Sequence, residues 1–285
     1  MPLLGAHMSI AGGLHLAFSR IREVQGEALQ IFTSNQRRWQ TVPLTPEMVA
    51  EFRRQWEKSD HMPVAAHDSY LINLAGPDSD HLEKSVVAFA DQLQRAAKLE
   101  IQFLITHPGS HLGQGLEAGL ERFVRNLDLA ITRSRVDSVT VLIETTAGQG
   151  TNVGSSFEEI GFILSQSKYS AHLGVCFDTS HTFAAGYDIR TPETYEGTFS
   201  RFDRTIGLER LKFFHINDSK PPLGSKVDRH AHIGKGEIGL SGFRLLLNDG
   251  KFQQHPMVLE TPKGKDLKED QENLRVLRSL IAGNE

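Results

Sequence analysis

The sequence predicts an α/β protein that folds as a closed (β/α)8 barrel, a TIM barrel. Eight short apolar runs alternate with eight helical segments along the 285 residues, and such alternation indicates a parallel sheet covered by helices. Eight units in a chain of this length are typical of a barrel whose active site lies at the C-terminal ends of the strands. An open, doubly wound sheet is the alternative, but no glycine-rich phosphate-binding fingerprint follows the first strand. No linker-like or low-complexity tract interrupts the pattern, so we expect one domain over residues 1–285.

Each expected strand is a short apolar run bounded by polar or small residues, which is the pattern of a buried parallel strand. In chain order the runs cover residues 3–9, 28–33, 62–66, 101–106, 139–143, 173–177, 211–214 and 257–259. Charged side chains are costly inside such strands unless they are paired. We therefore expect His, Asp and Glu to lie where the strands emerge into loops at one end of the barrel.

The helices between these strands have start signals in the sequence. A Gly-Gly pair precedes the first helical pattern, which ends at about residue 24. Thr45 caps the second helix with Pro46 at its first position, and Thr191 begins a later helix in the same way. The other helices are expected over residues 79–99, 115–136, 156–165 and 241–248, with a last one ending at about residue 281.

Composition and charge exclude several classes of protein. No segment approaches the roughly 18 apolar residues that a membrane helix needs, and residues 1–7 lack the pattern of a secretion signal. The only cysteine, Cys176, excludes an internal disulfide and lies in an apolar run, where inert packing is expected. A net charge of −4 argues against a general nucleic-acid coat but permits a basic rim around one site. We expect a cytoplasmic protein.

Side chains that can bind metals gather where the apolar runs end. Six of the eight runs are followed directly by such a residue: His67, His107, Glu144, Asp178, His215 and Glu260. Three more lie close by in the sequence: His181, one turn beyond Asp178, and Asp228 with His230 in the long loop after the seventh strand. In a barrel these strand ends converge on one mouth, so residues distant in sequence become neighbours.

Taken singly, each of these residues has an ordinary structural interpretation. A histidine at a strand end is commonly a hydrogen-bonded structural residue, and an Asp or Glu there is often a helix cap. Together, four carboxylates and five imidazoles in one cleft would repel one another or lack partners unless cations held them. The mixture suits zinc, manganese or iron, and nine residues exceed the three or four that one catalytic zinc uses. Several closely spaced ions suit hydrolysis of a phosphoester.

The candidate ligands belong to longer motifs that are spread over nearly the whole chain: Gly5-Ala-His-Met-Ser, Phe32-Thr-Ser-Asn-Gln-Arg37, His67-Asp-Ser-Tyr-Leu-Ile-Asn73, His107-Pro-Gly-Ser-His111, Glu144-Thr-Thr-Ala-Gly-Gln-Gly150, Gly174-Val-Cys-Phe-Asp-Thr-Ser-His181 with Ala184-Ala-Gly-Tyr-Asp188, His215-Ile-Asn-Asp218, Gly224-Ser-Lys-Val-Asp-Arg-His230, His232-Ile-Gly-Lys-Gly236 and Leu259-Glu-Thr261. In these motifs and in their order, the chain closely resembles the endonuclease IV family of apurinic/apyrimidinic-site DNA repair enzymes. Two departures, Thr145 where many members have Asn and Ser180 where some have Cys, leave every ligand position intact.

The resemblance implies three zinc ions, with manganese or iron as alternatives at some sites. It assigns His67 and His107 to the first ion, Asp178, His215 and Glu260 to the second with Glu144 bridging the two, and His181, Asp228 and His230 to the third. The implied activity is cleavage of DNA 5′ to abasic sites in base excision repair, leaving a 3′-hydroxyl and a 5′-deoxyribose phosphate. Glu144 and Glu260 would be the catalytic residues, and the partner would be duplex DNA with abasic or 3′-blocked lesions. We expect a monomer.

The resemblance also implies that side chains enter the DNA at the lesion, at the positions of Arg37, Tyr70 and Leu71. Arg37 follows a predicted strand and is suited to binding phosphate. Tyr70 and Leu71 lie beyond another strand end and are suited to wedging into an unstacked step. For Trp39, nearby in the sequence, ordinary packing is the expectation.

Two rival functions remain. A sugar isomerase or epimerase on the same barrel would use one metal ion, and Glu144, Asp178, His215 and Glu260 would suffice to bind it. The other five ligands would then have no purpose. A DNA-binding protein without catalysis would need no buried ligands, and the acidic net charge disfavours it.

Overall fold

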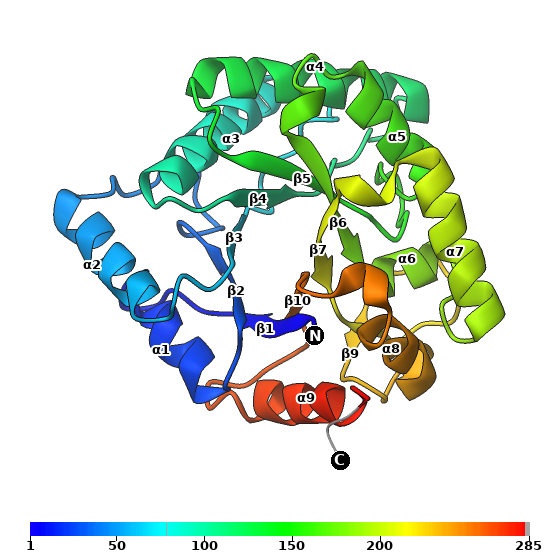
Figure 1. Cartoon of the computed structure of the whole chain (residues 1–285). Helices are drawn as coiled ribbons and strands as arrows, with labels where there is room; N and C mark the ends of the chain where they lie inside the picture. Colours follow the sequence, from blue (N-terminus) through cyan, green and yellow to red (C-terminus); the bar gives the residue numbers. More distant parts are fainter. Residues whose placement is uncertain (78, 283–285) are drawn as a thin grey trace.

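The structure, a computed structural model, describes residues 1–77 and 79–282. Eight parallel strands close into a barrel in the order β1-β10-β7-β6-β5-β4-β3-β2 (Figure 1), which confirms the predicted fold. The barrel strands are β1 (Leu3–His7), β2 (Ala28–Phe32), β3 (Val64–His67), β4 (Phe103–Thr106), β5 (Thr140–Glu144), β6 (Leu173–Asp178), β7 (Leu211–His215) and β10 (Pro256–Leu259). A separate two-stranded ribbon pairs β8 (Asp218–Ser219) with β9 (His230–Ala231).

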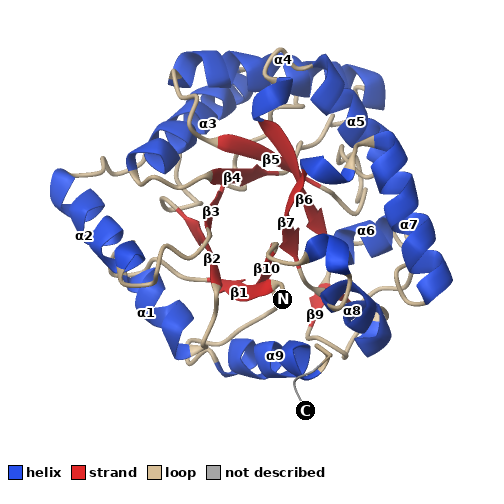
Figure 2. Ribbon diagram, viewed as in Figure 1, coloured by secondary structure: helices blue, strands red, loops and turns tan. Residues whose placement is uncertain are grey.

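The helices surround the barrel, as Figure 2 shows. They are α1 (Leu16–Glu23), α2 (Pro46–Glu57), α3 (Asp80–Lys98), α4 (Leu116–Ser134), α5 (Phe157–Gln166), α6 (Thr179–Ala185), α7 (Pro192–Thr205), α8 (Gly239–Leu247) and α9 (Lys268–Ser279), with short 3-10 turns at Ser170–His172, Leu208–Arg210 and Gly250–Phe252. The predicted start signals are present, since Thr45 and Thr191 each cap a helix with a side-chain oxygen that accepts a backbone N–H. No helix in the described part of the chain is long and apolar enough to cross a membrane.

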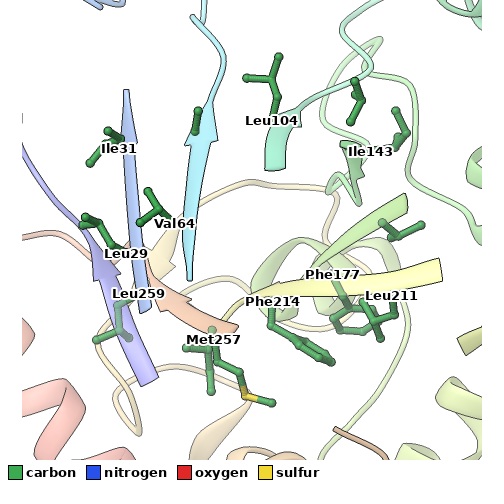
Figure 3. Close-up of a cluster of buried hydrophobic side chains, with 14 of the residues drawn as sticks. Leu29, Ile31, Val64, Leu104, Ile143, Phe177, Leu211, Phe214, Met257 and Leu259 are labelled. Atoms are coloured by element: carbon green, nitrogen blue, oxygen red, sulfur yellow. The ribbon is translucent and has the colours of Figure 1, made fainter. Parts of the chain in front are cut away.

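The alternation of side chains along each strand gives the barrel two cores. The outer core lies between strands and helices and includes Leu29, Ile31, Leu104, Phe177 and Leu259 (Figure 3). The inner core fills the barrel with one side chain from each of seven strands: Ala28, Ala65, Ile105, Leu142, Cys176, Phe213 and Val258. Cys176 is fully buried there, as expected for inert packing.

The residue two positions beyond the inner core is polar on every strand. Residues two apart share a face of a strand, so these side chains form a third layer at the C-terminal end of the barrel. They are His7, Gln30, His67, His107, Glu144, Asp178, His215 and Glu260. The apolar inner core therefore forms the floor of a polar mouth.

The expectation that β6 emerges into a loop is wrong. Asp178 ends β6 and at the same time caps α6, because its Oδ1 accepts the backbone N–H of His181 at 2.8 Å. Gly186 ends this helix with φ 112°, a conformation that favours glycine. The helix fixes Asp178 and His181 on adjacent turns of one rigid element, which a loop would not do.

Gly5 in β1 allows no side chain. A Cβ there would lie 1.8 Å from the carbonyl oxygen of Ala28, its partner in the barrel ladder. Gly5→Ala should therefore lower the free energy of unfolding by about 3 kcal/mol. Gly197→Ala in α7, where a Cβ meets nothing within 4 Å, should raise it by about 0.5–1 kcal/mol. Urea unfolding of both variants measures the difference, and a Gly5→Ala protein as stable as the wild type would contradict this strand register.

Candidate metal centre

Glu144 occupies the middle of the barrel mouth. It is the last residue of β5 and is fully buried. The distances from a ring nitrogen to the facing carboxylate oxygen are 3.1 Å for His67, 3.5 Å for His107, 3.1 Å for His181 and 3.1 Å for His215. One oxygen, Oε2, faces His67 and His107, and the other, Oε1, faces His181 and His215.

In the described part of the chain, Glu144 belongs to three groups of possible ligands, one of which joins it to His215 and the buried thiol of Cys176. The other two groups contain only histidines and carboxylates. The first group is His67, His107 and Glu144, and the second is Glu144, Asp178, His215 and Glu260. Within each group, one potential ligand atom from every residue lies within 4.8 Å of the others. Glu144 is common to both groups, which is the arrangement of a carboxylate that bridges two ions.

A third group lies beside the second. Asp178, His181 and His230 meet the same distance criterion. Asp228 Oδ1 lies 3.3 Å from His181 Nε2 and 3.6 Å from His230 Nε2, so Asp228 and His230 reach the same side, as alternate residues of an extended segment do. The structure thus brings all nine predicted ligands together, and it adds Asp178 to the surroundings of the third group.

Backbone carbonyls orient three of the histidine rings. His67 Nδ1 lies 2.9 Å from the carbonyl oxygen of the next residue, His181 Nδ1 lies 3.0 Å from that of Thr145, and His230 Nδ1 lies 3.2 Å from that of Glu260. A carbonyl oxygen only accepts, so each Nδ1 carries a proton and each Nε2 is left facing the cluster. A histidine that binds metal through Nε2 requires this tautomer.

Two buried polar atoms at the centre, Glu144 Oε1 and His215 Nδ1, make no hydrogen bond of satisfactory geometry although they lie 3.1 Å apart. Glu260 Oε2 is 3.3 Å from the same nitrogen. An unpaired buried polar group costs about 1–3 kcal/mol, and a cation among these atoms would remove that cost. The donor set, which mixes imidazole with carboxylate, fits zinc, manganese or iron.

The charges of the cluster oppose the effect of burial. Burial alone would lower the pKa of His67, but its hydrogen bond to Glu144 and the nearby carboxylates raise that pKa to about 10. The carboxylates likewise outweigh burial and raise the pKa values of His181 and His215. Burial would raise the pKa of Glu144, yet the surrounding histidines hold it well below its usual range. His107 differs, because burial lowers its pKa, so the carboxylates favour the protonated form of the other three rings only.

Sequence reasoning missed two residues that hold the ligands. Asn217, just after β7, donates from Nδ2 to Asp178 Oδ2 at 2.8 Å, and its Oδ1 accepts the backbone N–H of Glu260 at 2.8 Å. Gln30 lies inside β2, fully buried, and its side chain contacts both Glu260 and His215. The one signal for Gln30 in the sequence is a polar residue in the middle of an apolar run.

The loops that carry Arg37 and Leu71 lie next to each other on the rim. The Arg37 loop is a tight turn in which Asn35 Oδ1 accepts the Arg37 backbone N–H at 2.9 Å. Ser69 Oγ donates to the Gln36 carbonyl oxygen at 2.8 Å and joins this loop to the one that follows β3. Arg37 is exposed and Leu71 is half-buried.

Tyr70 stands between this rim and the metal-ligand cluster. Its side chain is 69% exposed, and its ring lies 6.2 Å from the ring of His67. A cavity of about 610 Å³ opens beside it, lined in part by Tyr70, Asp228, His230 and Glu260. Trp39 packs edge-on against the ring of His81 on α3, in agreement with the expected packing role.

Comparisons with known proteins agree on fold and family. Residues 18–280 match the family described as xylose isomerase-like TIM barrel. The chain is 52% identical to the probable endonuclease 4 of Chloroflexus aggregans over 99% of this chain and 98% of that protein. The crystal structure of endonuclease IV from Thermus thermophilus superposes with a TM-score of 0.88 at 38% identity over 98% of each chain. A D-tagatose 3-epimerase-like protein, with a TM-score of 0.70 at 17% identity over 97% of this chain and 98% of that one, shares the fold.

Zinc affinity should increase with pH. The pKa values of His67, His181 and His215 are raised, so these rings keep their protons to higher pH in the metal-free protein, and the protons must be released when the rings bind an ion. Zinc binding should therefore tighten from about pH 6 to about pH 8. Titration calorimetry in buffers of different ionisation enthalpy should show that protons are released when zinc binds. His172→Gln, at an exposed histidine before β6, should behave as wild type. Affinity independent of pH would contradict these protonation states.

Proposed function

Because the chain belongs to the endonuclease IV family, we propose that it is a zinc-dependent endonuclease of base excision repair. It cleaves duplex DNA 5′ to abasic sites and leaves a 3′-hydroxyl and a 5′-deoxyribose phosphate. Its substrates include DNA with 3′-blocked ends. The observation that carries the proposal is the convergence of five imidazoles and four carboxylates on one barrel mouth.

Three ions are proposed. The first two follow the first two groups, and at the third Asp228 joins His181 and His230 in place of Asp178. His67 and His107 hold the first, Asp178, His215 and Glu260 hold the second, Glu144 bridges these two, and His181, Asp228 and His230 hold the third. When bound, such ions activate water and neutralise charge on the phosphate oxygens. The mixed donor set also accepts manganese or iron in place of zinc.

Glu144 and Glu260 have different proposed roles because their exposure differs. Glu144 is fully buried and links the His67 and His107 side of the centre to the His181 and His215 side. The Glu260 side chain is 17% exposed and lines the cavity. Glu260 is therefore placed to orient the attacking water and to accept its proton.

The DNA would lie across the mouth, with Arg37, Tyr70 and Leu71 against the lesion. An abasic nucleotide has no base to unstack, so turning it toward the centre is inexpensive and selective. Tyr70 offers an exposed ring at the edge of the cavity, which can fill the space left by the missing base. Arg37 offers an exposed positive charge to the backbone.

An isomerase or epimerase on this barrel is the less supported function. It would need only the group of Glu144, Asp178, His215 and Glu260. Asp228 and His230, which meet His181 on the cavity side, would have no role. The epimerase-like relatives share only the fold at their level of identity.

The protein is further proposed to act as a cytoplasmic monomer with one domain over residues 1–285. Its single buried thiol, Cys176, is compatible with a reducing compartment. The ring of strands uses residues from both ends of the chain, since β1 pairs with β10, which supports a single folding unit.

The direct test of this function is incubation with a duplex that carries one tetrahydrofuran abasic analogue, followed by mapping of the cut ends. The analogue cannot undergo β-elimination, so a cut requires hydrolysis. We expect a 3′-hydroxyl immediately 5′ to the analogue. Glu260→Gln should fold but cut roughly 100- to 10,000-fold more slowly, because an amide cannot accept the proton. An intact analogue duplex, together with a borohydride-trapped adduct on natural abasic DNA, would refute the proposal.

Replacing Tyr70 or Arg37 with Ala should weaken binding to abasic DNA without changing the bound metal. Loss of the Tyr70 ring should cost about tenfold in Kd. Loss of Arg37 should lower the slope of log Kd against log salt by about one. Val87→Ala on α3 and Arg204→Ala on α7, both exposed away from the mouth, are the controls for fluorescence anisotropy at several salt concentrations. Wild-type affinity and salt slope in both rim variants would remove them from recognition.

The double variant Asp228→Ala/His230→Ala should lose one of three zinc ions and cut DNA at least about 100-fold more slowly, since both side chains face His181. Metal is measured by elemental analysis of the purified proteins. Asp137→Ala/His172→Ala, at exposed positions before β5 and β6, should keep three ions and full activity. A wild-type content of one ion, unchanged in the Asp228/His230 variant, would favour the isomerase.

A further inference from the structure

Gln30 is a side chain of the polar layer that the proposed chemistry does not use. It lies in β2 and is fully buried. Its amide contacts three side chains of the layer: Nε2 is 2.6 Å from Glu260 Oε1 and 2.9 Å from His7 Nδ1, and Oε1 is 2.6 Å from His215 Nε2. One uncharged residue therefore touches two members of the second ligand group.

The partners determine which way the amide points. A carboxylate oxygen only accepts, so the NH2 of Gln30 must face Glu260. The amide oxygen then faces His215 Nε2, which must donate and therefore carries a proton. In neutral His215 the lone pair is left on Nδ1, the atom that faces Glu144 Oε1 at 3.1 Å and makes no hydrogen bond.

The same contacts assign the two oxygens of Glu260. Oε1 accepts from Gln30, and His7 Nδ1 lies 3.3 Å from it. Oε2 is turned toward the centre and lies 3.3 Å from His215 Nδ1. With Oε1 committed to the amide, one oxygen of Glu260 is left for an ion or a water.

We propose that Gln30 is a positioning residue of the metal centre, which sets the tautomer of His215 and directs Glu260 Oε2 toward the ions. Its effect on catalysis rests on the proposed function, whereas its effects on the tautomer and on zinc binding do not require DNA. Loss of a partner that orients a metal ligand typically lowers metal affinity or activity by about 10- to 100-fold.

Gln30→Met tests this role because it keeps the length of the side chain and removes its hydrogen bonds to Glu260, His7 and His215. The control is Gln92→Met. Gln92 is 3% exposed, its Oε1 accepts from Thr33 Oγ1 at 2.7 Å, and its Nε2 donates to Ser34 Oγ at 3.1 Å, all outside the ligand cluster. Gln30→Met loses three buried hydrogen bonds and Gln92→Met loses two, so a general structural effect should lower Tm in both.

The expected difference between the two variants is in metal binding and turnover. Gln30→Met should bind zinc about 10- to 100-fold more weakly, and at saturating zinc its kcat should fall while KM for abasic DNA stays near wild type. Gln92→Met should bind zinc as wild type does. Wild-type zinc affinity and kcat in Gln30→Met would overturn the proposal.

A measurement on the unmodified protein covers the case in which Gln30→Met does not fold. Nitrogen-15 spectra of histidine-labelled, zinc-loaded protein should show His215 protonated at Nε2 and unprotonated at Nδ1, with its signals assigned by their loss in His215→Ala. A proton on Nδ1 would overturn the proposal. If the wild type leaves abasic DNA uncut, the proposed function fails, but the zinc affinities and the tautomer still decide the role of Gln30.

Discussion

The structure depends on one buried carboxylate, Glu144, and the four imidazoles that face it. Placing an unpaired carboxylate in the middle of a barrel would cost several kcal/mol. Here the cost is offset because His67, His107, His181 and His215 approach its two oxygens from different elements. Each of these histidines has Glu144 as its shared partner, so removing that carboxylate would weaken the pairing of all four imidazoles at once, although His181 and His215 also face Asp228 and Glu260. The centre is therefore a single cooperative unit and not a set of independent sites.

The barrel makes this unit achievable by its alternation of side chains. The apolar inner core fills the barrel, and the next inward position on every strand carries a polar group. Ligands such as His67, Glu144 and His215 therefore stand on strands that both cores hold rigidly. The groups proposed to touch DNA, by contrast, lie on exposed loops such as that of Arg37. Rigid strands hold the chemistry in place, while the loops are free to adapt to a distorted duplex.

The sequence was most informative where a polar side chain ends an apolar run. Polar groups at strand ends are visible as such, which is why the nine ligand candidates could be predicted before their distances were known. Gln30 was missed because it lies within a run that has the pattern of a buried strand, and only barrel closure shows that it shares an inward face with Ala28. Helix α6 was missed because a helix cap and a metal ligand were treated as alternative interpretations of Asp178, although the carboxylate that caps α6 also lies in the ligand groups. The ribbon of β8 and β9 pairs residues about a dozen apart, Ser219 with His230, and such short pairings leave no periodic pattern in the sequence.

The fold alone does not distinguish a nuclease from an isomerase, because the structures of proteins named as epimerases superpose on this chain. The choice depends on whether the groups around His67, His215 and His181 each hold an ion. Anomalous diffraction at the zinc absorption edge, from crystals grown without added metal, measures this directly. Three peaks are expected: one at His67 and His107, one at Asp178, His215 and Glu260, and one at His181, Asp228 and His230. A single peak beside Glu144, with none at Asp228 and His230, would contradict the three-ion centre.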